Sequence, residues 1–208
     1  MKLVGNKIRV IRDLSYLTNL NFLDISYGEI KKITNMNNLV KLKALHACKN
    51  KFTKFPKAIC QLKNLERLSL NKNEICKLPK NIKNLKKLKF LNLRDNKIKK
   101  IPRELCSLNK LQVLILDSNK IKKIPDMFIG LKKLREIFLC NNLIKKIPKN
   151  LFCLINLKQI MIGDNSIKYI PKEIDKLTKL EALKIENNML RNIPKQIGKL
   201  KKWYVWML

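Results

Sequence analysis

The chain has 208 residues, which is enough for one domain with a substantial core. Its hydrophobic fraction of 46% argues against a disordered polyelectrolyte, whereas 47 Lys and Arg against 15 Asp and Glu give a formal net charge of +32. Taken alone, that charge points to a nucleic acid or an anionic membrane as the partner.

The basic start of the chain, residues 1–12, has no apolar run of signal-peptide length, and no stretch reaches the roughly 18 apolar residues of a membrane span. The six cysteines lack Cys-x-x-Cys spacing, which argues against a zinc or redox site. We therefore expect an intracellular protein with reduced thiols, in the cytoplasm or alternatively the nucleus, with no metal and no cofactor.

From residue 42 onward the chain repeats itself every 23 residues. All seven prolines keep this period, with six intervals of 23, at Pro56, Pro79, Pro102, Pro125, Pro148, Pro171 and Pro194. Asparagines keep the same register at Asn50, Asn73, Asn96, Asn119, Asn142, Asn165 and Asn188. Such a period indicates stacked structural units, none of which can bury its own leucines and isoleucines.

The unit L-x-x-L-x-L-x-x-N-x-I-x-x-I-P-x-x-I-x-x-L resembles the leucine-rich-repeat family over essentially the whole chain. The 23-residue units resemble those of intracellular Ras-associated scaffold proteins. The first units have 22 residues, with Arg12 and Thr34 in place of proline, and resemble those of type-1 phosphatase regulatory subunits. We interpret residues 1–208 as one domain, with a partial repeat at 1–19, full repeats over 20–202 and a truncated repeat at 203–208.

The apolar spacing predicts an α/β fold. Alternation in Leu-x-Leu is typical of a short strand with one buried face, and the spacing of three after each proline suits a helical or 3-10 turn that begins at proline. The family implies a right-handed, horseshoe-shaped solenoid with a parallel sheet on its concave face and the short helical segments on its convex face. Each asparagine should point inward and satisfy the backbone of its own turn and of the next coil, whereas Gly28 at that position predicts a water or a local distortion.

Function should lie where repeats differ and meet solvent, which is on the outward positions of the strands. Five apolar residues come together there on adjacent repeats: Phe90, Val113, Ile115, Phe138 and Met161. Charged residues rim them, namely Arg94, Asp95, Asp117, Arg135 and Asp164. This pattern predicts a protein-binding site on the concave face, although partial coverage by neighbouring side chains would also explain it. The resemblance implies a non-catalytic scaffold in signalling. By resemblance, the partner would be a small GTPase or a phosphatase catalytic subunit.

The net charge is unevenly distributed over the repeat. The five outward strand positions of the eight full units hold nine basic and eight acidic residues, so nearly all the excess lies on the convex face and loops. Lysine pairs such as Lys99-Lys100, Lys122-Lys123 and Lys145-Lys146 would form a stripe there. The alternative function is thus polyanion binding, to nucleic acid or anionic membrane. A solvated face with a compositional bias toward lysine would explain the same residues. Tyr169 is the single aromatic residue among these positions, whereas nucleic-acid modules usually offer several rings for stacking.

Catalysis has one weak candidate, the pair His46 and Cys48 on one strand, with Asp24 and Ser69 on neighbouring strands. A Cys–His nucleophile also needs oxyanion donors and a pocket, which a shallow sheet does not offer, so we predict no enzymatic activity and no catalytic residue. The terminal segment 203–208 reads as a strand that either plugs the last coil or self-associates by pairing with another chain.

Overall fold

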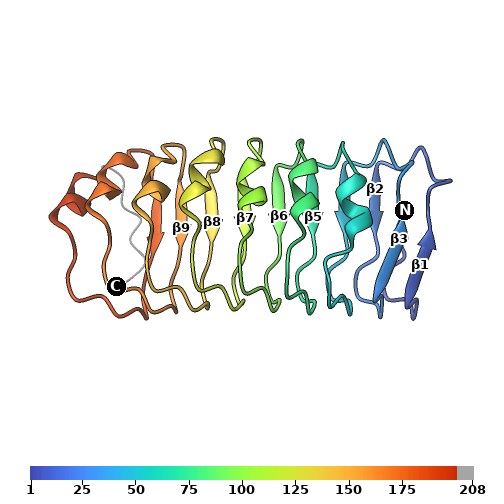
Figure 1. Ribbon diagram of the computed structural model, residues 1–208, viewed down its shortest axis with the longest axis horizontal. Coiled ribbons are helices and arrows are strands. Elements are labelled where there is room, and N and C mark those ends of the chain that lie inside the picture. The colour runs from blue at the N-terminus through green and yellow to red at the C-terminus, as the bar shows by residue number, and fades with distance from the viewer. Residues whose placement is uncertain (201–208) are drawn as a thin grey trace.

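The computed structural model describes residues 1–200, and each repeat contributes one strand to a sheet along one long side of the molecule (Figure 1). Eight strands pair in parallel there in chain order. They are β2 (Phe22–Asp24), β4 (Ala44–His46), β5 (Arg67–Ser69), β6 (Phe90–Asn92), β7 (Val113–Ile115), β8 (Glu136–Phe138), β9 (Gln159–Met161) and β10 (Ala182–Lys184). The middle residue of each strand is a leucine or isoleucine turned to the core, as the alternation predicts. The predicted repeat solenoid with a parallel sheet of short strands is confirmed.

Seven 3-10 segments form the opposite, convex side. They are η1 (Lys57–Gln61), η2 (Lys80–Asn84), η3 (Arg103–Ser107), η4 (Asp126–Gly130), η5 (Lys149–Cys153), η6 (Lys172–Lys176) and η7 (Lys195–Lys199). Proline precedes each segment instead of beginning it. Pro56 keeps extended angles (φ −66°, ψ 108°), and its carbonyl accepts the first turn bond from Ile59 N at 3.0 Å. Proline fits this capping position because its missing N–H group would have no partner within the 3-10 turn.

The two 22-residue repeats differ on the convex side, where the sequence indicated no strand. There β1 (Val10–Asp13) and β3 (Lys32–Asn35) pair in parallel, with Ile11 opposite Ile33. Arg12 and Thr34, which replace proline, keep an N–H group and leave φ free, so these stretches can extend into a ladder. The partial repeat at 1–19 also reaches the concave sheet, through a bridge between Lys2 and Asp24.

The asparagines form a buried ladder that ties successive coils together. Asn96 Oδ1 accepts a hydrogen bond from Ile75 N at 2.9 Å, and its Nδ2 donates to the carbonyls of Leu70 and Leu93, each at 3.0 Å. The prediction of an inward, backbone-satisfying amide is confirmed. The neighbour it serves is however the preceding coil, and not the next one, because Ile75 and Leu70 belong to the repeat before Asn96.

The ladder is interrupted at Gly28, which stands where the other repeats have asparagine, and neighbouring chain segments come close to it. A Cβ atom at Gly28 would lie 3.0 Å from Asn50 Oδ1 and 3.0 Å from the carbonyl oxygen of Asn6. Gly28 N still donates to Lys49 O at 3.0 Å, so the coil-to-coil backbone bond persists. Neighbouring chain segments therefore approach closely at Gly28, and a side chain there would require Asn50 or the carbonyl of Asn6 to shift.

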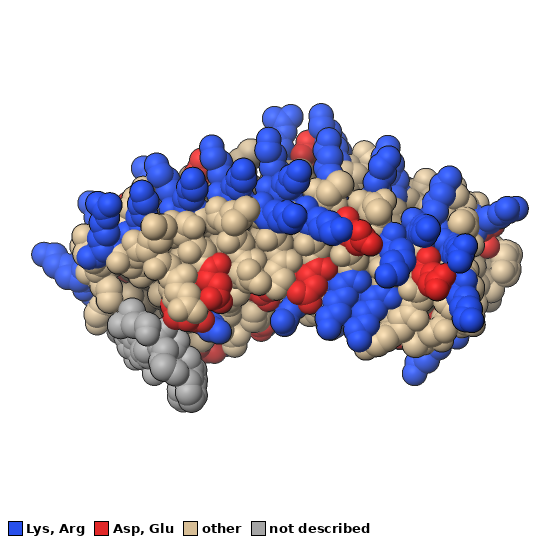
Figure 2. All heavy atoms as spheres, turned by 90° about the horizontal axis from the view of Figure 1, so that it is seen from below, with Lys and Arg blue, Asp and Glu red and all other residues tan. Residues whose placement is uncertain are grey.

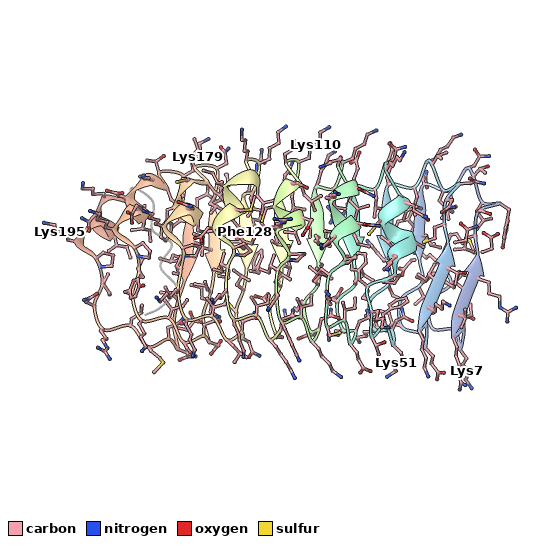
Figure 3. The ribbon with its side chains drawn as sticks, viewed as in Figure 1. Lys7, Lys51, Lys110, Phe128, Lys179 and Lys195 are labelled. Carbon is pink, nitrogen blue, oxygen red and sulfur yellow. The ribbon has the colours of Figure 1, made fainter. Side chains whose placement is uncertain are left out.

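The space between strands and 3-10 segments is filled by one continuous apolar core, in which Phe52, Phe128 and Phe152 are the largest enclosed side chains. Phe128, labelled in Figure 3, belongs to η4 and is fully buried. Within residues 1–200, no helix is long and apolar enough to cross a bilayer. The predicted truncated repeat at 203–208 and its proposed self-association lie outside the described residues.

Candidate protein-binding surface

The five predicted apolar residues form a continuous patch on the outer face of the sheet. Strand register places Phe90 opposite Val113 on one side, and Ile115, Phe138 and Met161 in a row on the other. Val113 and Ile115 share β7 and join the two rows. We call these five residues the apolar patch. All five side chains are partly exposed, so the patch combines a packed base with an accessible surface.

Arg67 bounds the patch on its amino-terminal side, a role that the sequence reasoning missed. Its guanidinium carbon lies 4.3 Å from the centroid of the Phe90 ring, in a cation–π contact between β5 and β6. The strand register alone could have revealed this neighbour. The contact covers part of Phe90 and holds a positive charge at the patch border.

Four of the five predicted rim residues present charge to solvent or pair at the surface. Arg94 is exposed and lies 3.5 Å from the Asp95 carboxylate, and Arg135 is exposed as well. Asp164 accepts a hydrogen bond from Asn187 Nδ2 at 2.8 Å while it stays exposed. Asp95 and Asp164 both adopt left-handed backbone angles (φ 53°), which aspartate tolerates better than most residues.

Asp117, the fifth rim residue, uses its carboxylate for a hydrogen bond within the protein. Its Oδ1 accepts a hydrogen bond from the Cys140 N–H at 2.8 Å, and burial raises the pKa of its carboxyl group. The same kind of backbone donor is satisfied elsewhere by Asp24 at Ser26 N and by Asn92 at Arg94 N, each at 3.0 Å. Asp117 thus forms part of the floor beside the patch, where it supports the turn after β8.

Ion pairs, two of them between neighbouring repeats and one within a repeat, neutralise part of the remaining charge on this face. Lys89 Nζ lies 2.7 Å from Glu66, Lys158 Nζ lies 2.9 Å from Glu181, and Lys184 Nζ lies 2.8 Å from Glu186. These three lysines therefore face acidic neighbours, which keeps the surface around the patch near neutral.

The side chains considered for catalysis have other contacts. Cys48 Sγ lies 3.0 Å from Ser26 Oγ, and the His46 ring packs edge-on against Phe22 with centroids 5.2 Å apart. Burial raises the pKa of Cys60, Cys106 and Cys140 to about 11, so these thiols stay protonated near neutral pH. Within residues 1–200, no three His, Cys, Asp or Glu side chains are grouped to hold a metal ion.

Comparisons with known proteins agree with this architecture. A sequence model described as a leucine-rich repeat region matches residues 80–166. A leucine-rich-repeat protein of Leptospira interrogans is 30% identical, with a TM-score of 0.81 over 97% of this chain and 57% of that one. An internalin of Listeria monocytogenes is 25% identical, with a TM-score of 0.85 over 96% of this chain and 57% of that one. A comparison with curated proteins finds no match.

A third similar structure is a plant peptide hormone receptor in complex with RGF2, which is 26% identical. Its TM-score is 0.83, over 97% of this chain and 34% of the receptor. The chain thus spans little more than half of the first two relatives and about a third of the receptor.

Proposed function

We propose that this leucine-rich-repeat protein is a non-catalytic module that binds a protein partner through the apolar patch on its concave sheet. The observation that carries the proposal is the continuity of Phe90, Val113, Ile115, Phe138 and Met161 across four adjacent strands. An apolar centre with a neutral, polar surround is the anatomy of a protein interface, and its aromatic members are the residue types that dominate binding energy.

The neighbours support protein binding in general terms, since the plant receptor was solved in complex with RGF2. Leucine-rich repeats are binding modules, and their specificity lies in the surface residues and not in the fold. We place the protein in signalling in the cytoplasm, as a scaffold. By the resemblance of its repeats, a small GTPase and a phosphatase catalytic subunit are the first partners to test.

Two charges inside the patch test this function. In an I115E/F138E variant, the two glutamates lie opposite each other on adjacent strands. A partner that covers the patch would have to bury these charges, which costs binding energy. The matched control is H46E/S69E, which adds the same charges in the same row on β4 and β5, outside the patch. Purified wild type and variants are immobilised and probed with a GTP-loaded small GTPase, a type-1 phosphatase catalytic subunit and a lysate of the source cell.

The expected result is a partner that binds the wild type and the control and binds I115E/F138E at least about thirtyfold more weakly, as for hot-spot residues. Circular dichroism verifies that each variant is folded. A partner that binds all three proteins equally would show that the concave patch is not the binding surface.

A further inference from the structure

The convex side carries lysines in a regular array that the proposed function does not use. Three consecutive repeats place a lysine pair between two core isoleucines, and we call these six residues the basic stripe: Lys99, Lys100, Lys122, Lys123, Lys145 and Lys146. All six side chains are exposed. Figure 2 shows Lys and Arg side chains projecting along the whole convex outline of the molecule.

The stripe differs from three of the lysines on the sheet face in forming no ion pair. Lys89, Lys158 and Lys184 form ion pairs of 2.7–2.9 Å, whereas within residues 1–200 none of the six stripe lysines forms one. The stripe therefore carries an excess of positive charge that can attract an external anion.

A groove of about 740 Å³ lies within the stripe. Lys122, Lys123, Lys145 and Lys146 line it together with Tyr169 and Pro148. Tyr169 is 45% exposed, so an amphipathic ring stands among four cationic side chains. Asp126 and Glu173 also line the groove, and they leave it with an excess of positive charge because Lys149 lines it too.

Large apolar side chains are exposed beside this groove. Met127 and Ile129 of η4, the segment that begins at the groove-lining Asp126, are 57% and 50% exposed. Anionic phosphate surfaces attract the lysines, and an anionic bilayer also accepts exposed aliphatic side chains. A single-stranded nucleic acid would instead call for several stacking rings, and the stripe and its groove offer Tyr169 alone.

We propose that the convex face docks this protein on the surface of an anionic lipid bilayer. The lysine stems lie along the surface and place their ammonium groups at the lipid phosphates, while Tyr169 and Met127 enter the interfacial layer. The attraction reaches about 8 Å at physiological salt, so the arched face need not touch the plane at every repeat. Docked in this way, the protein turns the apolar patch away from the bilayer and leaves it free for a partner.

The test is co-sedimentation of the whole chain with large vesicles of phosphatidylcholine alone or with 30% phosphatidylserine. We expect binding to the anionic vesicles, little binding to the neutral ones and a steep loss between 50 and 300 mM NaCl. A K122Q/K123Q/K145Q/K146Q variant should bind the anionic vesicles at least tenfold more weakly, since each lysine near such a surface contributes roughly fivefold in affinity.

The matched control is K63Q/K110Q/K132Q/K133Q. It removes the same net charge from the loops at the amino ends of the strands, the edge at which Figure 3 shows Lys110, and none of these four side chains forms an ion pair within residues 1–200. We expect it to keep at least a third of the wild-type affinity. Equal losses in both variants would assign the binding to net charge and overturn docking by this face.

An M127S/I129S variant separates the bilayer from other polyanions. It should weaken vesicle binding at least threefold and leave binding to a 20-nucleotide single-stranded RNA unchanged within twofold, because serine removes apolar insertion while the charges and the Tyr169 ring remain. If the RNA binds more tightly than the anionic vesicles at the same salt, and the lysine variant loses that RNA binding, the bilayer proposal is wrong and the face is a nucleic-acid surface.

Discussion

The guanidinium of Arg67 lies over the ring of Phe90, 4.3 Å from its centroid, and this contact sets the border of the apolar patch. Arg67 belongs to β5 and Phe90 to β6, in directly paired positions. The ring is consequently shielded on one side by a cation that is itself exposed. A partner that binds the patch meets a positive charge at this border and apolar surface beyond it.

Replacing Arg67 by alanine should lower the free energy of unfolding by about 0.5–1 kcal/mol, which is typical of an exposed cation–π pair. Urea unfolding of wild type, Arg67→Ala, Phe90→Leu and the double variant measures the coupling between the two side chains. Arg135→Ala is the control, because Arg135 is exposed on the same face without such a ring contact among the described residues. Additive single effects would show that the contact contributes nothing.

The asparagine ladder predicts a large and local stability effect. Asn96→Ala leaves the buried N–H of Ile75 without its acceptor and removes one of the two amide donors from each of the carbonyls of Leu70 and Leu93, which keep their bonds from Asn73 and Asn119. We expect a loss of about 2 kcal/mol in the free energy of unfolding, since a stranded buried polar group costs about 1–3 kcal/mol. Urea denaturation followed by circular dichroism gives the value.

The control for the ladder is Asn109→Ala, at an exposed position. It should change the free energy of unfolding by less than about 0.5 kcal/mol, as surface substitutions usually do. If Asn96→Ala proved as mild as Asn109→Ala, the ladder would not be the tie between coils that its geometry indicates.

Much of the fold was predictable because each repeat has the same apolar pattern and therefore forms the same local structure. Alternation around Leu91 or Leu114 can form a strand with only one buried face, and a 23-residue period then fixes the neighbour of every residue. That register alone predicts that the residues of the apolar patch lie side by side. The strands β1 and β3 were not predictable in this way, because their formation depends on which backbone donors remain free once proline is absent, and not on hydrophobic spacing.

The roles of individual polar side chains were less predictable for the same reason. Asp117 looked like a rim charge, since its position in the repeat points to the concave side. Whether it serves a partner or the backbone depends on the Cys140 N–H lying 2.8 Å away, which only the three-dimensional turn reveals. Sequence register therefore identifies which residues share a surface, but not which of their polar atoms are still available.

Gly130 predicts a steric effect on the convex side. A Cβ atom there would lie 2.3 Å from the carbonyl oxygen of Cys106, so Gly130→Ala must push η4 away from η3. We expect a loss of about 2 kcal/mol in the free energy of unfolding, in the range of overpacked cores. Gly198→Ala is the control, because nothing lies within 4 Å of its Cβ position, and it should be nearly neutral. Similar thermal midpoints for the two variants would contradict this close contact.

The half-buried carboxyl of Asp117 predicts a particular pH dependence of stability. Burial is the main cause of its raised pKa, and the bond from Cys140 N and the charge of Arg94 only partly oppose it. Because the folded pKa lies above the ordinary 3.8, the folded state binds the proton more tightly than the unfolded state does. Ionisation of Asp117 therefore lowers the free energy of unfolding as the pH rises through the window above 3.8, and this contribution is absent at lower pH.

Asp117→Asn removes the ionisation and keeps a side-chain oxygen that can accept the Cys140 N–H. Relative to wild type, this variant should gain stability as the pH rises from 3 to 7, and at pH 7 it should be at least as stable as wild type. Urea unfolding at several pH values provides the comparison. Glu74→Gln is the control of opposite sign. The bond from Lys97 lowers the pKa of Glu74, so ionisation of Glu74 favours folding. The Glu74→Gln variant should therefore lose stability relative to wild type as the pH rises through the window below 4.5. A constant difference between wild type and Asp117→Asn across this range would mean that the Asp117 carboxylate is as well solvated in the folded protein as in the unfolded chain.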